Sequence, residues 1–147
     1  RKDFSPKEPS PPCFFVNDMD AIVDQSKLGE YNQAKTDTIS ALEGTFTVIE
    51  SMPCIEFWYL LHYRYTDKYF PNYNSLKPVL LKEIPTYQKT AKCRSKMYPI
   101  LKDKINTAIG NAAKTMKKKG SCEGDCSYTN MHELITMLDE VYSKLST

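Results

Sequence analysis

Apolar residues recur at intervals of three and four along most of this chain, which is the spacing of an α-helix with one buried face. The clearest example follows Asn130, where the apolar stripe comprises Met131, Leu134, Ile135, Leu138, Val141, Tyr142 and Leu145. Asn130 with Glu133 has the form of an approximate capping box, a signal for the start of a helix. The pattern therefore predicts a C-terminal helix from residue 131 onwards.

The same spacing predicts further helices, whose ends are marked by an N-cap residue, proline or glycine. They are expected over residues 17–29, 32–52, 54–70, 78–84 and 86–119, the last with a kink at Pro99. The segment 54–70 is aromatic on nearly all sides and is expected to be central. No segment alternates convincingly as a strand, so the predicted fold class is an all-α bundle of about five helices.

Length and composition indicate one folded domain. A chain of 147 residues with 41% hydrophobic residues is large enough to bury a core and too apolar to be disordered throughout. Residues 1–12 are rich in proline and are predicted to form an extended tail, with residues 13–147 as a single helical domain. The longest apolar and aromatic stretch, residues 55–65, is too short for a transmembrane helix.

Five cysteines in a helical chain of this size favour a secreted, disulfide-braced protein. An up-and-down bundle would bring Cys13, Cys54, Cys122 and Cys126 to one end, which predicts two disulfides among them. Cys93 would then be unpaired, or would link two copies of the chain. A sharp bend at Pro99 could instead pair Cys93 with Cys54, and a reduced protein with buried thiols is the alternative. The start at Arg1, without an initiator methionine, is what a mature secreted product or a trimmed chain would show.

Charge is segregated along the chain. Residues 77–119 carry twelve basic and two acidic side chains, a net charge of +10. Residues 17–56 carry two basic and eight acidic side chains, a net charge of −6, and residues 122–147 have a net charge of −4. Since the whole chain has a formal charge of only +2, the near-neutral total conceals a strong separation of charge.

The basic segment suggests a binding face for an anionic partner. The candidate residues are Lys89, Lys92, Lys96, Lys117, Lys118 and Lys119. The expected partner is an extracellular protein receptor or a sulfated glycosaminoglycan. The alternative is a solvated face that balances the acidic helices of the same molecule. Nucleic-acid binding is not expected, because the helix lacks the interleaved Arg and Asn side chains that read bases.

The aromatic segment suggests a second type of site, a pocket for a small hydrophobic ligand. Phe57, Trp58 and Tyr63 are the candidate lining residues, because aromatic rings offer an apolar wall and a tyrosine adds a hydroxyl group. Aromatic stripes of this kind are also common in protein cores. The pocket is therefore the alternative to the basic face.

The sequence offers little for catalysis or metal binding. His62 and His132 are the two histidines, and neither belongs to a recognisable catalytic motif. Cys122 and Cys126 could join both histidines around zinc, but their spacing favours disulfides. The acidic side chains nearest the N-terminus lack the glycine turn and terminal glutamate of a calcium loop; these are Asp18, Asp20 and Asp24. No metal, cofactor or enzymatic activity is therefore expected.

These observations predict a secreted, extracellular binding protein of the cytokine-like or parasite- and venom-effector kind. It would be a monomer or a dimer linked through Cys93. The basic face is the expected binding surface, and a carrier of a small hydrophobic ligand is the alternative function.

Overall fold

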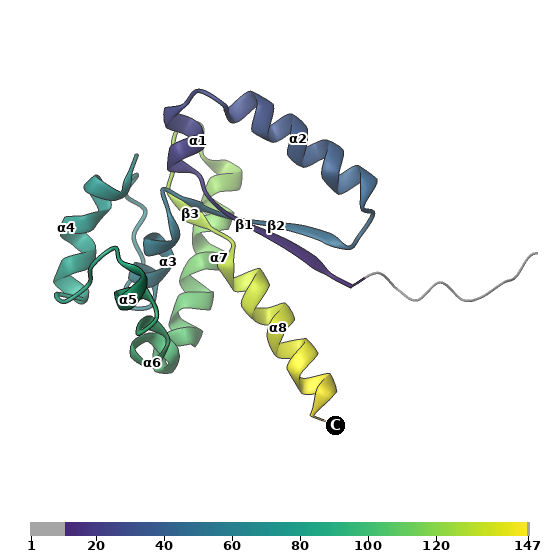
Figure 1. The fold of residues 1–147 in the computed structure, drawn as a ribbon. Coiled ribbons are helices and arrows are strands. Elements are labelled where there is room, and N and C mark those ends of the chain that lie inside the picture. Colours follow the sequence, from purple (N-terminus) through teal and green to yellow (C-terminus); the bar gives the residue numbers. More distant parts are fainter. Residues whose placement is uncertain (1–10, 147) are drawn as a thin grey trace, which may run out of the picture.

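The computed structural model describes residues 11–146 and shows a mixed α/β fold, in which a small sheet is enclosed by helices (Figure 1). The elements in chain order are β1 (Cys13–Asp18), α1 (Asp20–Asp24), α2 (Leu28–Ala41), β2 (Phe46–Met52), α3 (Ile55–Leu61), α4 (Tyr73–Glu83), α5 (Ala91–Arg94), α6 (Met97–Leu101), the 3₁₀ turn η1 (Lys102–Lys104), α7 (Ile105–Ser121), β3 (Tyr128–Thr129) and α8 (Met131–Leu145). The predicted all-α class is therefore wrong.

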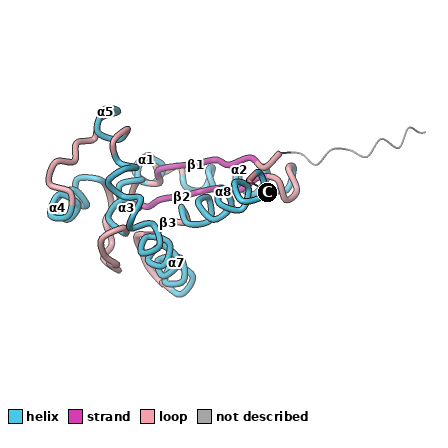
Figure 2. Tube along the Cα trace, turned by 90° about the horizontal axis from the view of Figure 1, so that it is seen from below, coloured by secondary structure: helices cyan, strands magenta, loops and turns pink. Residues whose placement is uncertain are grey.

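The three strands lie side by side in the order β1-β2-β3 (Figure 2). β1 and β2 are parallel, in a register that places Phe15 opposite Val48 and Asp18 opposite Ser51. β3 is a short antiparallel strand on the other side of β2. Because β1 and β2 run in the same direction, both carboxyl ends reach the same edge of the sheet.

Different helices cover the two faces of the sheet. On one face, Tyr31 and Lys35 of α2 contact Glu50 of β2. Ile49 points to the opposite face and is fully buried in the main hydrophobic core. That core is built mainly from α3, α4, α7 and the start of α8, and it includes Phe57, Leu60, Leu61, Phe70, Leu76, Leu80, Ala108, Ala112 and Met131.

Strands occupy part of two segments that were expected to be helical. Residues 17–18, expected to begin a helix, instead end strand β1, and the segment expected to be one helix over 32–52 divides into α2 and β2. The apolar residues Phe46 and Ile49 fit a helical interval of three, but they belong to a run that is apolar or β-branched at most positions. Such runs are typical of strands in parallel sheets, which are buried on both faces.

The predicted long helix over 86–119 is also interrupted. It separates into α5, α6, η1 and α7, and Pro99 lies inside α6. Only its C-terminal half forms a long helix, where Ala108 and Ala112 are buried as the apolar stripe predicted. The helix expected over 54–70 is limited to α3, and residues 64–70 form an irregular connection.

The predicted disulfides are absent. Cys13, Cys54, Cys93, Cys122 and Cys126 are all free thiols. Because an up-and-down bundle does not form, Cys13 and Cys54 do not join Cys122 and Cys126, which lie beside each other as thiols. The reduced state removes the argument for a disulfide-braced, secreted protein. Pairing of Cys93 with a second copy stays a prediction.

The C-terminal helix was predicted correctly, although its start is held differently. The side chain of Asn130 bridges two backbone groups of β2: its amide oxygen accepts a hydrogen bond of 2.7 Å from Glu50 N–H, and its amide nitrogen donates one of 3.0 Å to Val48 C=O. Asn130 therefore joins α8 to the sheet rather than capping the helix with its side chain.

Within residues 11–146, no helix has both the length and the apolar composition that crossing a bilayer requires. The predicted tail covers residues 1–12, of which 1–10 lie outside the described residues.

Candidate functional site

The carboxyl edge of the parallel pair β1–β2 gathers three acidic residues from separate elements. Asp18 is the last residue of β1, Asp20 begins α1, and Glu56 lies in the first turn of α3, which follows β2 almost immediately. Ligands in sheets with parallel strands bind outside the carboxyl ends of the strands. This edge is therefore the first place to look for a functional site.

Asp18 is held by the start of α3. Its Oδ1 atom accepts a hydrogen bond of 2.8 Å from the backbone N–H of Ile55. Burial raises the pKa of Asp18 above its ordinary value, and the negative charges of Glu56 and Asp20 raise it further, whereas the Ile55 hydrogen bond and Lys89 act in the opposite direction. The net shift is upward chiefly because this carboxyl group is buried, and the two neighbouring acids add to it.

Asp20 lies two residues beyond the end of β1 and is fixed through its backbone. Its N–H donates a hydrogen bond of 3.0 Å to the carbonyl of Pro53 in the turn after β2. Its own Oδ1 accepts a hydrogen bond of 2.7 Å from Ala21 N–H. This hydrogen bond between Asp20 and Pro53 joins the segments that follow β1 and β2, close to the two aspartates.

Glu56 is a fully buried carboxylate. Its Oε1 atom accepts a hydrogen bond of 2.8 Å from the hydroxyl group of Tyr87. Its Oε2 atom has no hydrogen-bond partner among the described residues, and lies 3.8 Å from Lys89 Nζ. A buried carboxylate needs compensation by charge or hydrogen bonds, so this half-satisfied group is unusual within the core.

Among the described residues, Lys89 is the one cation paired with Glu56. Its Nζ atom also lies 4.5 Å above the centre of the Tyr73 ring, and its side chain is partly exposed. Burial and the hydrogen bond to Glu56 raise the pKa of Tyr87, so this hydroxyl stays protonated and acts as a donor. One ammonium group against three carboxylates leaves the edge with an excess of negative charge.

Thiol chemistry and a cage of protein ligands for a metal are both poorly supported at this edge. Burial, followed by a hydrogen bond with Glu56, raises the pKa of the Cys54 thiol, and a raised pKa makes a cysteine a poor nucleophile. Among residues 11–146, no three or more His, Cys, Asp or Glu side chains are arranged to hold a metal ion. A cation at this edge would therefore keep coordination positions for water or a ligand.

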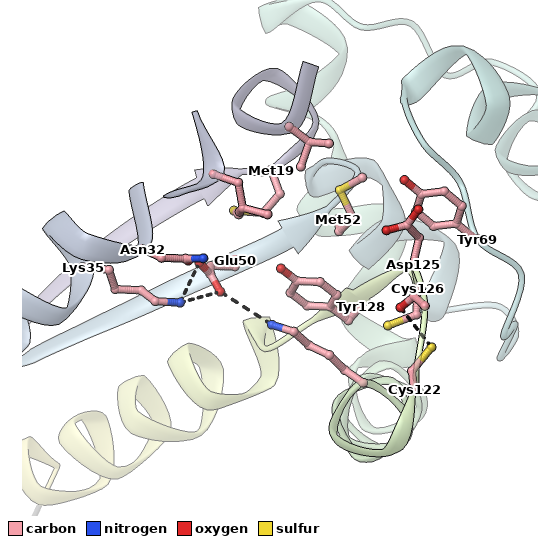
Figure 3. A pocket seen from close by; sticks show the side chains of 14 residues that line it. Met19, Asn32, Lys35, Glu50, Met52, Tyr69, Cys122, Asp125, Cys126 and Tyr128 are labelled. Carbon is pink, nitrogen blue, oxygen red and sulfur yellow. Dashed lines mark hydrogen bonds and ion pairs between the residues drawn. The ribbon is translucent and has the colours of Figure 1, made fainter. Parts of the chain in front are cut away.

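A second polar cluster lies on the face of the sheet that α2 covers, in a cavity of about 370 Å³ (Figure 3). Glu50 is its centre: it accepts a hydrogen bond of 2.6 Å from Tyr31 Oη, and its carboxylate lies 3.1 Å from Lys35 Nζ and 4.0 Å from Lys119 Nζ. Lys119 also lies 3.7 Å above the ring of Tyr128. Burial lowers the pKa of Lys119. Two ammonium groups thus flank one carboxylate, so the cluster is an internal ion-pair network.

Two of the predicted disulfide cysteines line the same cavity (Figure 3). The Sγ atom of Cys122 donates a hydrogen bond of 3.3 Å to the carbonyl of Gly124. Burial raises the pKa of the Cys126 thiol, and its contact with Cys122 raises it further. The other two predicted partners lie elsewhere, because Cys13 begins β1 and Cys54 precedes α3.

The six lysines predicted to form one basic face are dispersed. Lys89, Lys118 and Lys119 are paired with acidic residues, namely Glu56, Asp67 and Glu50 respectively. Lys92 lies in α5 and Lys96 just before α6, while Lys117 lies in the last turns of α7. These three are exposed. For half of the set, the structure thus shows the balancing of acidic groups that was the alternative interpretation.

The predicted aromatic pocket is only partly reproduced. Trp58 lines a cavity of about 370 Å³ formed by α3, α6, α7 and α8. Phe57 is fully buried in the core, and Tyr63 contacts Lys104 at 5.2 Å from its ring centre. A ligand in this cavity stays a prediction.

The two histidines do not form a site together. His62 is buried, with Nδ1 2.9 Å from the carbonyl of Trp58, and burial lowers its pKa. Burial also lowers the pKa of His132. The zinc set considered from the sequence is not assembled in the described part of the chain.

From the sequence, Asp18 and Asp20 were considered for a cation and set aside, and Glu56 and Tyr87 were missed. The signal that could have found the edge is the run Cys13–Val16 followed by Asn-Asp-Met-Asp, because an apolar run ending in acidic residues is typical of a buried strand with a polar carboxyl end. Glu56 lacked a local signal, since it lies in an otherwise apolar helix. Glu56 accepts its hydrogen bond from Tyr87, which lies 31 positions later in the chain.

The fold and the carboxyl edge define a small α/β domain with an acidic site at the end of a parallel strand pair. The chain belongs to the RloB-like family, since the model of the family described as RloB-like protein matches residues 4–138. That description names no reaction and no ligand. Searches of curated proteins and of solved structures returned no match.

Proposed function

We propose that this chain binds a phosphate-bearing ligand together with a divalent cation, of which Mg²⁺ fits best, at the carboxyl edge of β1 and β2. The observation that carries the proposal is the placement of Asp18, Asp20 and the buried Glu56 at the carboxyl ends of β1 and β2, close enough for Glu56 and Asp20 to repel Asp18, with Lys89 as the cation paired with Glu56. A cation bound by the two aspartates would relieve that repulsion. A phosphate group of the ligand would complete its coordination.

The donor set favours Mg²⁺ over other common metals. Magnesium is usually bound through one or two carboxylates, with water and substrate phosphates filling its remaining positions. Asp18 and Asp20 supply such a pair, two residues apart where β1 ends and α1 begins. Zinc would require more nitrogen or sulfur ligands, and the nearby Cys54 thiol is buried with a raised pKa.

Glu56 and Lys89 have a supporting role in this proposal. The carboxylate of Glu56 is too enclosed to meet a ligand directly, but it adds negative potential behind the aspartates. Lys89 lies partly exposed on the connection between α4 and α5, where a phosphate oxygen could reach its ammonium group. Lysine is a common phosphate-binding residue because it acts as a mobile point charge.

Binding of Mn²⁺ as a paramagnetic substitute for Mg²⁺ tests the proposal. Titration followed by electron paramagnetic resonance should show bound Mn²⁺, and adenosine monophosphate should tighten the binding by providing phosphate oxygens. Asp18→Asn and Asp20→Asn should each weaken Mn²⁺ binding by about tenfold or more, equivalent to about 1.4 kcal/mol.

Asp103→Asn is the matched control, because it removes one exposed carboxylate from η1 rather than from the edge. Its Mn²⁺ affinity should equal that of the unchanged protein. Equal Mn²⁺ affinity in all three variants would contradict the proposal. No reaction is assigned to this edge, so the expectation that the chain is not an enzyme stays a prediction.

A second candidate function is the binding of an anionic polymer by the basic side of α7. Lys104 and Lys114 lie 5.2 and 5.6 Å above the rings of Tyr63 and Tyr65, and Lys118 contacts Asp67 at 2.9 Å. These contacts line up lysines and tyrosines where residues 63–67 pass along the helix. The surface shares Lys118 with the set predicted from sequence, but its other lysines, Lys104 and Lys114, were not in that set.

Heparin affinity separates the two basic surfaces. If α7 carries the binding, Lys104→Glu with Lys114→Glu should reduce the salt concentration that elutes the protein from immobilised heparin, because fewer ion contacts form. Lys92→Glu with Lys96→Glu has the same charge change and should elute like the unchanged protein. The reverse order would favour the surface predicted from sequence.

A further inference from the structure

β1 is an edge strand along one entire side. It pairs with β2 only, and within residues 11–146 nothing pairs with its other side. Exposed strand edges are normally protected by charged side chains, by proline or by a covering element. Residues 13–16 of β1 are Cys, Phe, Phe and Val, so this edge carries none of the protecting side chains along most of its length.

The direction of the free backbone groups follows from the two ends of the strand. Cys13 N–H donates to Thr45 C=O at 2.6 Å, and Met19 N–H donates to Ser51 C=O at 3.0 Å. Both groups therefore face β2. Since consecutive residues of a strand direct their backbone groups to opposite sides, the N–H and C=O groups of Phe14, Val16 and Asp18 face away from β2.

The side chains of β1 are also unusually exposed for a strand of a parallel pair. Phe15 is 49% exposed on the face toward α2, and Val16 is 51% exposed on the opposite face. Strands in parallel arrangements are normally buried on both faces. Exposure on both faces at the same point of the strand shows that no element within residues 11–146 covers this side of β1.

An apolar groove runs beside this edge on the α2 face. It has a volume of about 360 Å³, and its walls include Phe15, Phe46 and Val48 from the strands and Ala34 and Thr38 from α2. Lys35 is the one charged residue lining it. The groove has room for an apolar side chain that projects from a strand placed next to β1.

We propose that an extended apolar segment of a second polypeptide adds to β1 as a further strand. The free backbone groups, which recur at every second residue, would hydrogen-bond to the backbone of this segment, and one of its alternate side chains would enter the groove. This is the mode of recognition called β-augmentation, in which backbone hydrogen bonds provide affinity and side-chain pockets provide specificity. A small apolar molecule would leave the row of backbone groups unpaired.

The pattern of amide protection tests this proposal directly. The probe is an acetylated, amidated heptapeptide with the sequence of Phe46–Met52, an extended segment that in the folded chain forms the strand on the other side of β1. Hydrogen exchange of the full chain, followed by nuclear magnetic resonance, should show fast exchange at the outward amides of Phe14, Val16 and Asp18. Saturating peptide should slow exchange of these three amides by about tenfold or more.

Val16→Pro removes one outward N–H and should abolish the protection, because proline is tolerated at a strand edge but cannot donate a hydrogen bond there. Val16→Thr keeps the N–H group and should bind the peptide like the unchanged chain. Persistent protection of the inward amides of Cys13 and Phe15 shows that Val16→Pro is folded.

Unchanged exchange at the outward amides in the presence of the peptide would overturn the proposal. So would protection of the outward amides that rises with protein concentration and needs no peptide, since it would place a second copy of this chain on the edge. Equal peptide protection in Val16→Pro and Val16→Thr would show that the peptide binds elsewhere.

Discussion

The carboxylate of Asp18 accepts a hydrogen bond of 2.8 Å from the backbone N–H of Ile55, which lies 37 residues later in the chain. This contact fastens the end of β1 to the start of α3. Because Glu56 follows Ile55 directly, the same contact brings a buried carboxylate close to the aspartates. The acidic edge is thus a consequence of how the two parallel strands end.

The charge state of Asp18 predicts how stability depends on pH. Its pKa is raised in the folded protein, so folding favours the protonated form. This contribution to stability is present below the unfolded pKa and is lost as pH rises through the folded pKa. In urea denaturation at a series of pH values, Asp18→Asn should gain unfolding free energy relative to the unchanged protein across that window. A difference that does not vary with pH would contradict this prediction.

The hydroxyl group of Tyr87 is predicted to stabilise the fold through Glu56. Tyr87→Phe removes the donor of the 2.8 Å hydrogen bond and leaves a buried carboxylate with one fewer partner. The free energy of unfolding should fall by about 1–3 kcal/mol. Tyr98→Phe is the matched control because Tyr98 is 77% exposed, and its effect should stay within about 0.5 kcal/mol. Similar losses in both variants would argue against this role of Glu56.

Asn130 is predicted to be a structural link between α8 and the sheet. Asn130→Ala removes its hydrogen bonds to the backbone of Val48 and Glu50, which should lower the free energy of unfolding by about 1–3 kcal/mol. The exposed Asn106 of α7 provides the control substitution Asn106→Ala. If Asn130 acted merely as a helix cap, its loss would affect exchange of the first amides of α8 and leave those of β2 unchanged.

The thiols are predicted to be reduced and to differ in reactivity. All five cysteines should react with a disulfide reagent in denaturant without prior reduction, because all are free. In the native protein Cys13 should react first, since it is exposed, and Cys54 last, since it is fully buried and its pKa is raised. Fewer than five reactive thiols in denaturant would restore the disulfide hypothesis.

The buried His62, which follows α3 directly, predicts a second pH effect of the opposite sign to that of Asp18. Burial lowers the pKa of His62, so the neutral form is favoured by folding. Stability is therefore full above the unfolded pKa of about 6.5 and is lost as pH falls through that value toward the folded pKa. His62→Gln should reduce the change of the denaturation midpoint with pH over this range. An unaltered pH profile would show that folding does not favour the neutral form of His62.

Local patterns predicted those elements whose partners lie nearby or whose amphipathic face is wide. The helix α8 was predicted because its apolar residues follow helical spacing for fifteen residues. The C-terminal part of the basic segment was predicted for the same reason, and Ala108 and Ala112 are buried as expected. In both cases one side of a single helix meets the core, so spacing along the chain contains the required information.

Local patterns did not predict the strands, because a strand is stabilised by pairing with residues far away in the sequence. β1 and β2 are short, and their apolar residues fit a helical interval as well as a buried strand. What makes them strands is their pairing with each other, across the intervening helix α2. The cysteines were misinterpreted for a related reason: their number suggested disulfides, whereas their distances depend on a topology that the spacing did not reveal.

By itself, the sequence determined that this chain has a core, where its last helix lies and how its charges are divided along the chain, but it gave no reason to choose Asp18 and Asp20 as a cation site. The tertiary structure alone decided that both aspartates stand at the end of a parallel strand, with Glu56, Tyr87 and Lys89 behind them. The buried face of a helix can be read from the spacing of nearby residues. Strand pairing and buried charge depend on contacts between residues far apart in sequence, which only the folded chain brings together.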